Sequence, residues 1–86
     1  MERTPRLASV EPAGQMELLV RFENGVEKTY DCRQLLARPQ FARLRSPAFF
    51  CAVKVDPGGY GISWSDDIDL SEYELWVNGK GVSQDR

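Results

Sequence analysis

The stretch that decides the fold is Met16–Asp31, which reads MELLVRFENGVEKTYD. Its first half alternates apolar and other residues with a period of two, which predicts a β-strand with one buried face. Glu23-Asn24-Gly25 supplies turn residues, and residues 26–31 continue as a second strand. The pattern therefore predicts a β-hairpin. The apolar face of its first strand carries Met16, Leu18, Val20 and Phe22.

The hydrophobic pattern also predicts the length of the hairpin loop. A two-residue loop would pair Phe22 with Glu27 and so place a charge on the apolar face. A three-residue loop pairs Phe22 with Val26 and puts Gly25 in the left-handed conformation that such loops require. Because a slip of one residue inverts every side chain, we predict the three-residue loop.

Further elements are predicted on both sides of this hairpin. A strand over residues 6–10 ends at a turn that contains Pro12 and Gly14. After the hairpin, Asp31 is a candidate cap for a helical turn that must end near Arg38, because Pro39 lacks an N–H group. Residues 39–44 are expected to form a second turn, which Ser46-Pro47 ends.

The second half of the chain predicts another hairpin and a short helix. Residues 48–55 (AFFCAVKV) are rich in strand-forming types, and residues 60–64 are expected to return with Tyr60, Ile62 and Trp64 on one face. Ser71 and Glu74 have the spacing of a helix cap, which predicts a helix over about residues 72–76. Residues 77–86 are expected to be a flexible tail.

These elements predict a single domain over residues 1–86, with an ordered core over about residues 6–76. Its fold class is α+β: an antiparallel β-meander of about five strands in two hairpins, with a helical segment after the third strand and a short C-terminal helix. The expected core comprises Leu7, Leu18, Val20, Phe22, Tyr30, Leu36, Phe41, Leu44, Phe49, Val53, Ile62, Trp64 and Leu70.

The composition excludes several chemistries. The 86 residues contain no histidine, so Ser-His-Asp and Cys-His catalysis are absent. Cys32 and Cys51 cannot form a four-ligand zinc site and are too far apart for a CxxC motif, so we expect two buried thiols and no cofactor. No signal peptide and no apolar stretch long enough to cross a membrane are present, so we expect a cytoplasmic protein.

The formal net charge is only −2, but the charges are segregated along the chain. Residues 33–55 carry five basic side chains and no acid, whereas residues 56–76 carry six acidic side chains and no base. One interpretation is that the two segments neutralise each other within the monomer. The other is that they form opposite patches that meet a partner.

Several short motifs together resemble a known family. They are ENG at residues 23–25, YD at 30–31, LL at 35–36, the pair Phe41 and Leu44, and Trp64 followed by IDL at 68–70. Over residues 6–76 the chain resembles a family of small bacterial proteins classed as a domain of unknown function. Some longer relatives carry a C-terminal helix-turn-helix, and the resemblance implies a gene beside another small gene, as in toxin–antitoxin pairs. It implies no catalytic residues.

One candidate site is a surface for binding a partner, not for catalysis. The candidate partner-binding residues are Trp76, Tyr73, Asp66 and Asp67. Tryptophan is enriched at interface hot spots. The aspartates, with Asp69, are more typical of turn and capping residues than of a Mg²⁺ or Ca²⁺ site, so no metal is expected. We expect Tyr30 and Tyr73 to be edge residues with surface hydroxyls.

The sequence therefore predicts a non-enzymatic interaction module, an adaptor or antitoxin-like partner of another small protein. A homodimer is compatible with this prediction. The alternative is a nucleic-acid-associated regulatory domain that contacts phosphates through the segment from residue 33 to residue 45. The arginines of that segment are Arg33, Arg38, Arg43 and Arg45.

Overall fold

The computed structural model describes residues 4–82 of the chain. Its elements are strands (β), α-helices (α) and 3₁₀-helices (η). In chain order they are β1 (Leu7–Pro12), β2 (Glu17–Phe22), β3 (Glu27–Asp31), η1 (Cys32–Ala37), η2 (Pro39–Arg45), α1 (Pro47–Phe50), β4 (Lys54–Val55), η3 (Pro57–Gly59), β5 (Gly61–Ser65), β6 (Ile68–Ser71), α2 (Glu72–Asn78) and β7 (Lys80–Gly81). No helix in this range is long and apolar enough to span a membrane.

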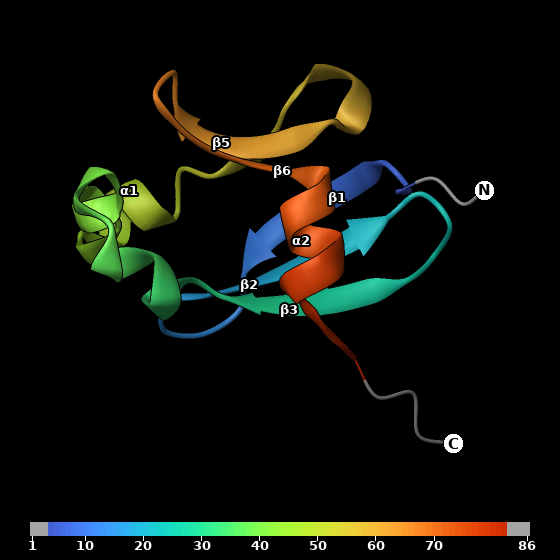
Figure 1. Ribbon diagram of the computed structural model, residues 1–86, viewed down its shortest axis with the longest axis horizontal. Coiled ribbons are helices and arrows are strands. Elements are labelled where there is room, and N and C mark those ends of the chain that lie inside the picture. The colour runs from blue at the N-terminus through green and yellow to red at the C-terminus, as the bar shows by residue number, and fades with distance from the viewer. Residues whose placement is uncertain (1–3, 83–86) are drawn as a thin grey trace.

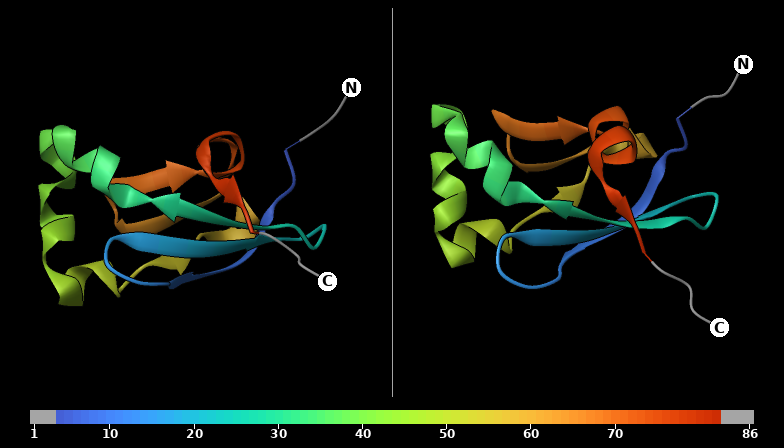
Figure 2. Two further views of the ribbon diagram at one scale, coloured as in Figure 1. Left: turned by 90° about the horizontal axis from the view of Figure 1, so that it is seen from below. Right: turned by 60° about the horizontal axis from the view of Figure 1, so that its bottom comes forward.

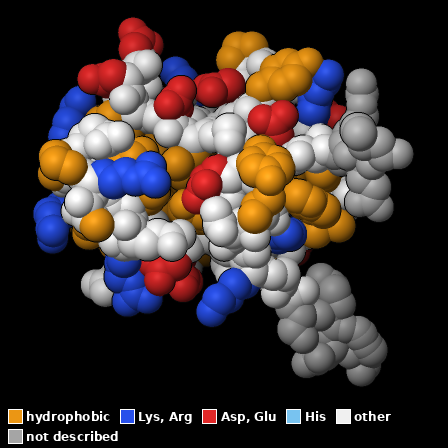
Figure 3. Space-filling model, in the orientation of Figure 1, with side chains coloured by type: hydrophobic (Ala, Val, Ile, Leu, Met, Phe, Trp, Pro, Cys, Tyr) orange, Lys and Arg blue, Asp and Glu red, His pale blue; other side chains and the backbone are white. Residues whose placement is uncertain are grey.

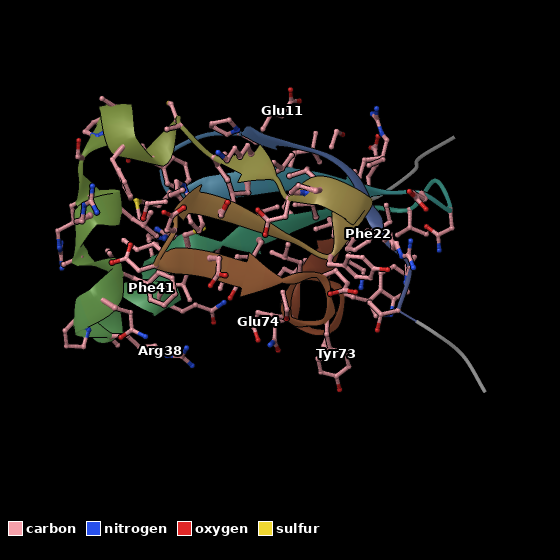
Figure 4. All side chains as sticks on the ribbon, turned by 90° about the horizontal axis from the view of Figure 1, so that it is seen from above. Glu11, Phe22, Arg38, Phe41, Tyr73 and Glu74 are labelled. Atoms are coloured by element: carbon pink, nitrogen blue, oxygen red, sulfur yellow. The ribbon has the colours of Figure 1, made fainter. Side chains whose placement is uncertain are left out.

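The strands form two antiparallel sheets that stack on each other (Figures 1 and 4). One sheet has the order β1-β2-β3-β7 and the other the order β4-β5-β6. Helices η1, η2 and α1 lie together at one end, and α2 lies along one side, where it contacts β3, β5 and β6. Within the described residues no helix covers the outer face of the four-stranded sheet (Figure 2). The predicted α+β class is confirmed, with seven strands in place of about five.

The predicted three-residue loop of the first hairpin is confirmed. Leu18 pairs with Tyr30, and the Phe22 N–H donates to the Val26 carbonyl at 2.9 Å. Gly25 has φ +91°, the left-handed conformation that the loop requires. This register places Leu18, Val20 and Phe22 on the buried face of β2.

The helical segment after the third strand is also confirmed. The Asp31 carboxylate accepts a hydrogen bond from the Arg33 N–H at 2.9 Å and caps η1, which ends before Arg38. Pro39 begins η2. Leu35, Phe41 and Leu44 point into the core from these two helices.

The prediction of a strand over residues 48–55 is wrong for most of its length. Residues 47–50 form α1, in which Ser46 is the N-cap and Pro47 the first residue. Pro is preorganised for the first helical position, so Ser46-Pro47 begins a helix here instead of only ending one. Only Lys54 and Val55 pair with β5. Strand propensity is overridden because a helical Phe50 is buried and its carbonyl accepts a hydrogen bond from Trp64 Nε1 at 3.0 Å.

The last third contains two strands that the sequence did not predict, β6 and β7, and β7 pairs with β3. β6 pairs with β5 across the Asp66-Asp67 turn. The predicted helix forms as α2, with the Ser71 hydroxyl accepting from the Glu74 N–H at 3.1 Å. Residues 77, 78, 80 and 81 of the expected tail lie in α2 and β7, and residues 83–86 lie outside the described residues.

Most of the predicted core is buried, with a few exceptions that follow from the corrected elements. Three residues of the predicted core are only partly buried: Leu36, Phe49 and Val53. Phe49 and Val53 were predicted on one face of a strand that does not form there. Tyr60 was predicted on one strand face with Ile62 and Trp64, but it is exposed, because the chain is still in a helical conformation there and β5 begins one residue later. Cys32 is buried as predicted, whereas Cys51 is exposed beyond the end of α1. The core also contains Cys32, Leu35, Phe50, Ile68 and Leu75.

Candidate functional site

Helix α2 carries apolar side chains both on the side that packs on the protein and on the side that faces solvent. Leu75 is fully buried, whereas Tyr73 and Val77 are 63% and 52% exposed. Tyr73 and Val77 are four residues apart, so they are neighbours on one side of the helix. Tyr73 points away from the molecule (Figure 4). The sequence prediction of Tyr73 as a surface residue is therefore confirmed.

Trp76 is half-buried and packs on the protein itself. Its ring meets Phe22 edge to face, with centroids 4.9 Å apart. The ammonium of Lys28 lies 4.1 Å from the centre of the same ring and donates to the Trp76 carbonyl. Trp76 therefore joins α2 to the first hairpin, and only part of its ring is open to a partner.

Tyr60 extends this apolar surface beyond the start of α2. It is 54% exposed, and its carbonyl accepts a hydrogen bond from the Glu72 N–H at 3.0 Å. The guanidinium of Arg6 lies 4.3 Å from the centre of the Tyr60 ring. We call Tyr60, Tyr73, Trp76 and Val77 the α2 face. Within the described residues it contains all three exposed large hydrophobic residues, and Figure 3 shows hydrophobic side chains over this region.

A partly buried hydrogen bond holds α2 on the sheet beneath it. The Tyr30 hydroxyl donates to Glu74 Oε2 at 2.7 Å. Tyr30 is fully buried, so the prediction that its hydroxyl lies at the surface is wrong: α2 covers the end of β3. Burial, and then the hydrogen bond and charge of Glu74, raise the pKa of Tyr30.

Asp66 and Asp67 do not join the α2 face. They form the exposed turn between β5 and β6, where the Ser65 hydroxyl donates to Asp67 Oδ1 at 2.8 Å. The four residues of β6, about 13 Å of extended chain, separate them from α2. Over residues 4–82 no group of three or more acidic or cysteine side chains is placed to hold a metal ion.

The four arginines named from the sequence are exposed at the end formed by η1 and η2, where basic side chains gather (Figure 3). Their environments differ. Arg33 pairs with Asp31 at 2.9 Å, and its hydrogen bonds lower the pKa of that carboxyl group. The Arg43 guanidinium lies 4.2 Å from the centre of the Phe49 ring, and Arg38 separates the two helices. Within residues 4–82 the side-chain ion pairs are Arg21–Glu27 and Arg33–Asp31. Neither of them joins the basic segment, residues 33–55, to the acidic segment, residues 56–76.

The sequence analysis missed a cavity beside this basic end. It has a volume of about 390 Å³ and lies between the turn that follows β1 and helices η2 and α1. Pro12, Met16, Leu44, Arg45, Phe50 and Cys51 are among its lining residues. No local pattern reveals it, because its walls come from segments about 30 residues apart in the chain.

Comparison with known proteins gives a family and no function. No curated protein and no solved structure shows significant similarity to the chain. A family described as "Protein of unknown function (DUF2442)" matches residues 7–81, which include every strand and helix described above. The chain belongs to this family of proteins of unknown function.

Proposed function

We propose that this protein is a non-enzymatic interaction module that binds another small protein through the α2 face, as an adaptor or an antitoxin-like partner. The observation that carries the proposal is the exposure of Tyr73 and Val77 side by side on α2. Exposed Tyr60 is joined to the start of the same helix by the hydrogen bond from the Glu72 N–H to its carbonyl. Clustered exposed apolar side chains on a soluble domain mark interaction surfaces, and tyrosine is enriched at their energetic centres.

The charges around the α2 face favour a specific protein partner. Arg6 and Lys28 cover one side of Tyr60 and Trp76, while Glu72 and Glu74 lie on the helix itself. Such a mixed rim around an apolar centre is typical of protein–protein interfaces. The free thiols of Cys32 and Cys51 fit a reducing compartment, so we place this interaction in the cytoplasm.

The test begins with a tagged pull-down from native lysate, half of it treated with nuclease. The captured protein is then purified and titrated against the wild type and against Tyr73→Ser/Val77→Ser. We expect the double variant to bind at least about tenfold more weakly, because both side chains lose their buried area. Asp66→Asn/Asp67→Asn is the matched control and should bind as the wild type does.

Two results would reject this function. One is the absence of any stoichiometric protein that survives nuclease treatment. The other is unchanged affinity of the purified partner for Tyr73→Ser/Val77→Ser. If the α2 face instead binds a second copy of the chain, sedimentation equilibrium will show a dimer that this double variant converts to monomer.

Nucleic-acid binding is the second candidate, and one observation favours it. Within the described residues Arg38, Arg43 and Arg45 form no ion pair, so their charges are available to phosphates. Fluorescence anisotropy with short DNA and RNA duplexes at low salt tests this function. We would then expect Arg38→Gln/Arg43→Gln/Arg45→Gln to reduce both affinity and its salt dependence, and no signal at micromolar protein would reject the candidate.

A further inference from the structure

The cavity between the β1–β2 turn and the helical end is large enough for a small ligand. Its volume of about 390 Å³ falls within the range of small-molecule sites. Met16, Leu44 and Phe50 supply apolar wall, with Pro12 and Pro47 beside them. Leu44 and Phe50 belong to the hydrophobic core, with 0% and 5% of their surface exposed, so the apolar body of a ligand placed here would lie over the edge of the core.

The cavity has one charged lining residue, and it is positive. Arg45 lines the cavity and is itself exposed to solvent. Arg45 forms no ion pair with any acid in residues 4–82, and no acidic residue lines the cavity. This arrangement favours an anionic group over a neutral or cationic one.

The wall opposite the helices is held in place by the backbone. Met16 has φ +60°, a left-handed conformation that is strained for a residue other than glycine. The Met16 carbonyl accepts a hydrogen bond from the Cys32 N–H at 2.7 Å, and the Ala13 N–H donates to the Glu17 carbonyl at 2.9 Å. These bonds fix the turn, so the cavity is preformed. Binding of a ligand therefore loses little conformational entropy from ordering this wall.

We propose that this cavity binds a small organic carboxylate with an apolar body. The apolar body lies against Met16 and Phe50, over the buried Leu44, and the carboxylate pairs with the Arg45 guanidinium. A carboxylate and a guanidinium have opposite charges, and their planar groups fit each other in geometry. The apolar contacts supply the remaining affinity. This site lies apart from the α2 face and does not depend on the function proposed for that face.

The test compares two ligands that share an apolar body, octanoate and 1-octanol, by NMR titration of the full chain. We expect octanoate to shift the Met16 methyl and Leu44 methyl signals, and the Trp64 indole signal through Phe50, on which Trp64 stacks at 6.3 Å. Arg45→Gln should weaken octanoate binding about five- to tenfold while leaving 1-octanol binding unchanged. Arg38→Gln is the matched control, because Arg38 does not line the cavity and points outward (Figure 4).

Alkylation of Cys51 gives an independent measurement. Cys51 lines the cavity and is exposed, whereas Cys32 is buried, so N-ethylmaleimide should react at Cys51 first. We expect saturating octanoate to slow this reaction severalfold. The proposal is overturned if millimolar octanoate shifts no signal of the cavity wall, if Arg45→Gln and Arg38→Gln bind octanoate equally, or if octanoate leaves the alkylation rate of Cys51 unchanged.

Discussion

The hydroxyl of Tyr30 and the carboxylate of Glu74 are joined by a 2.7 Å hydrogen bond across 44 residues of sequence. Tyr30 lies near the end of β3, and Glu74 lies in the first turn of α2. The bond satisfies a fully buried hydroxyl and fastens the candidate partner-binding helix to the four-stranded sheet. The position of the α2 face therefore depends on the first hairpin as well as on the helix itself.

Tyr30→Phe should lower the free energy of unfolding by about 1–2 kcal/mol, because it leaves the partly buried Glu74 carboxylate without its donor. Urea denaturation followed by tryptophan fluorescence measures this loss. Tyr73→Phe is the matched control and should change stability by less than about 0.5 kcal/mol, since Tyr73 is exposed. Equal effects of the two substitutions would contradict a stabilising role for the buried bond.

Cys32 should make the fold sensitive to alkaline pH. Burial, followed by the charge of Asp31, raises the pKa of the Cys32 thiol from its ordinary value of 9.0 to about 12. The folded state therefore holds the thiol proton more tightly than the unfolded state. This stabilisation is complete below pH 9 and is lost as the pH rises from 9 toward 12, at about 1 kcal/mol per pH unit.

Urea denaturation at pH 8, 9 and 10 measures this loss. Cys32→Ala should flatten the slope of stability against pH above pH 9, although it also lowers stability at neutral pH by removing a buried side chain. Cys51→Ala is the control at the exposed thiol and should retain the slope of the wild type. If Cys32→Ala keeps the full slope, the buried thiol is not its source. Tyr30, whose pKa is raised from its ordinary value of 10.0, adds a loss of stability in the same direction from about pH 10 upward.

Gly25→Ala should destabilise the first hairpin by about 1 kcal/mol through the backbone alone. Gly25 has φ +91°, and no heavy atom lies within 4 Å of where a Cβ would stand, so the cost comes from conformation and not from a clash. Gly81→Ala is the matched control: its site is equally open and its φ lies outside the left-handed region. Chemical denaturation should show no more than about 0.5 kcal/mol for that variant. A neutral Gly25→Ala would argue against the three-residue loop.

Ser71→Ala should cost about 1 kcal/mol, because it removes the oxygen that accepts the Glu74 N–H at the start of α2. Ser71→Asp keeps an acceptor and should restore most of the stability. Hydrogen exchange at the Glu74 amide reports the cap directly and should quicken in Ser71→Ala only. Unchanged exchange in that variant would show that the cap does not hold the helix end.

Local patterns predicted those parts of the fold whose causes lie close together in the chain. The alternation in β2 and the conformational demand on Gly25 set the register of the first hairpin without help from distant residues. Asp31 and Ser71 cap the helices that follow them, because a side-chain oxygen reaches an N–H two or three residues ahead. Tyr73 lies on the surface as predicted, but the same argument failed for Tyr30, which α2 covers.

Other features depended on contacts between distant segments. The strand-forming composition of residues 48–55 predicted a strand, but burial of Phe50 and the Trp64–Phe50 hydrogen bond favour helix α1. The candidate sites divide in the same way. Tyr73 and Trp76 lie on one helix, whereas Asp66 and Asp67 lie at the far end of β6, a separation that only the path of that strand reveals.

The sequence by itself determined the α+β class, the first hairpin and its register, the helix caps, and the lack of histidine chemistry, because each follows from residue types within a few positions of one another. Only the tertiary structure decided the division into two sheets, the burial of Tyr30 against Glu74, the exposed α2 face and the cavity beside Arg45. Those features arise where segments far apart in the chain exclude water together, and no local pattern records which segments will meet.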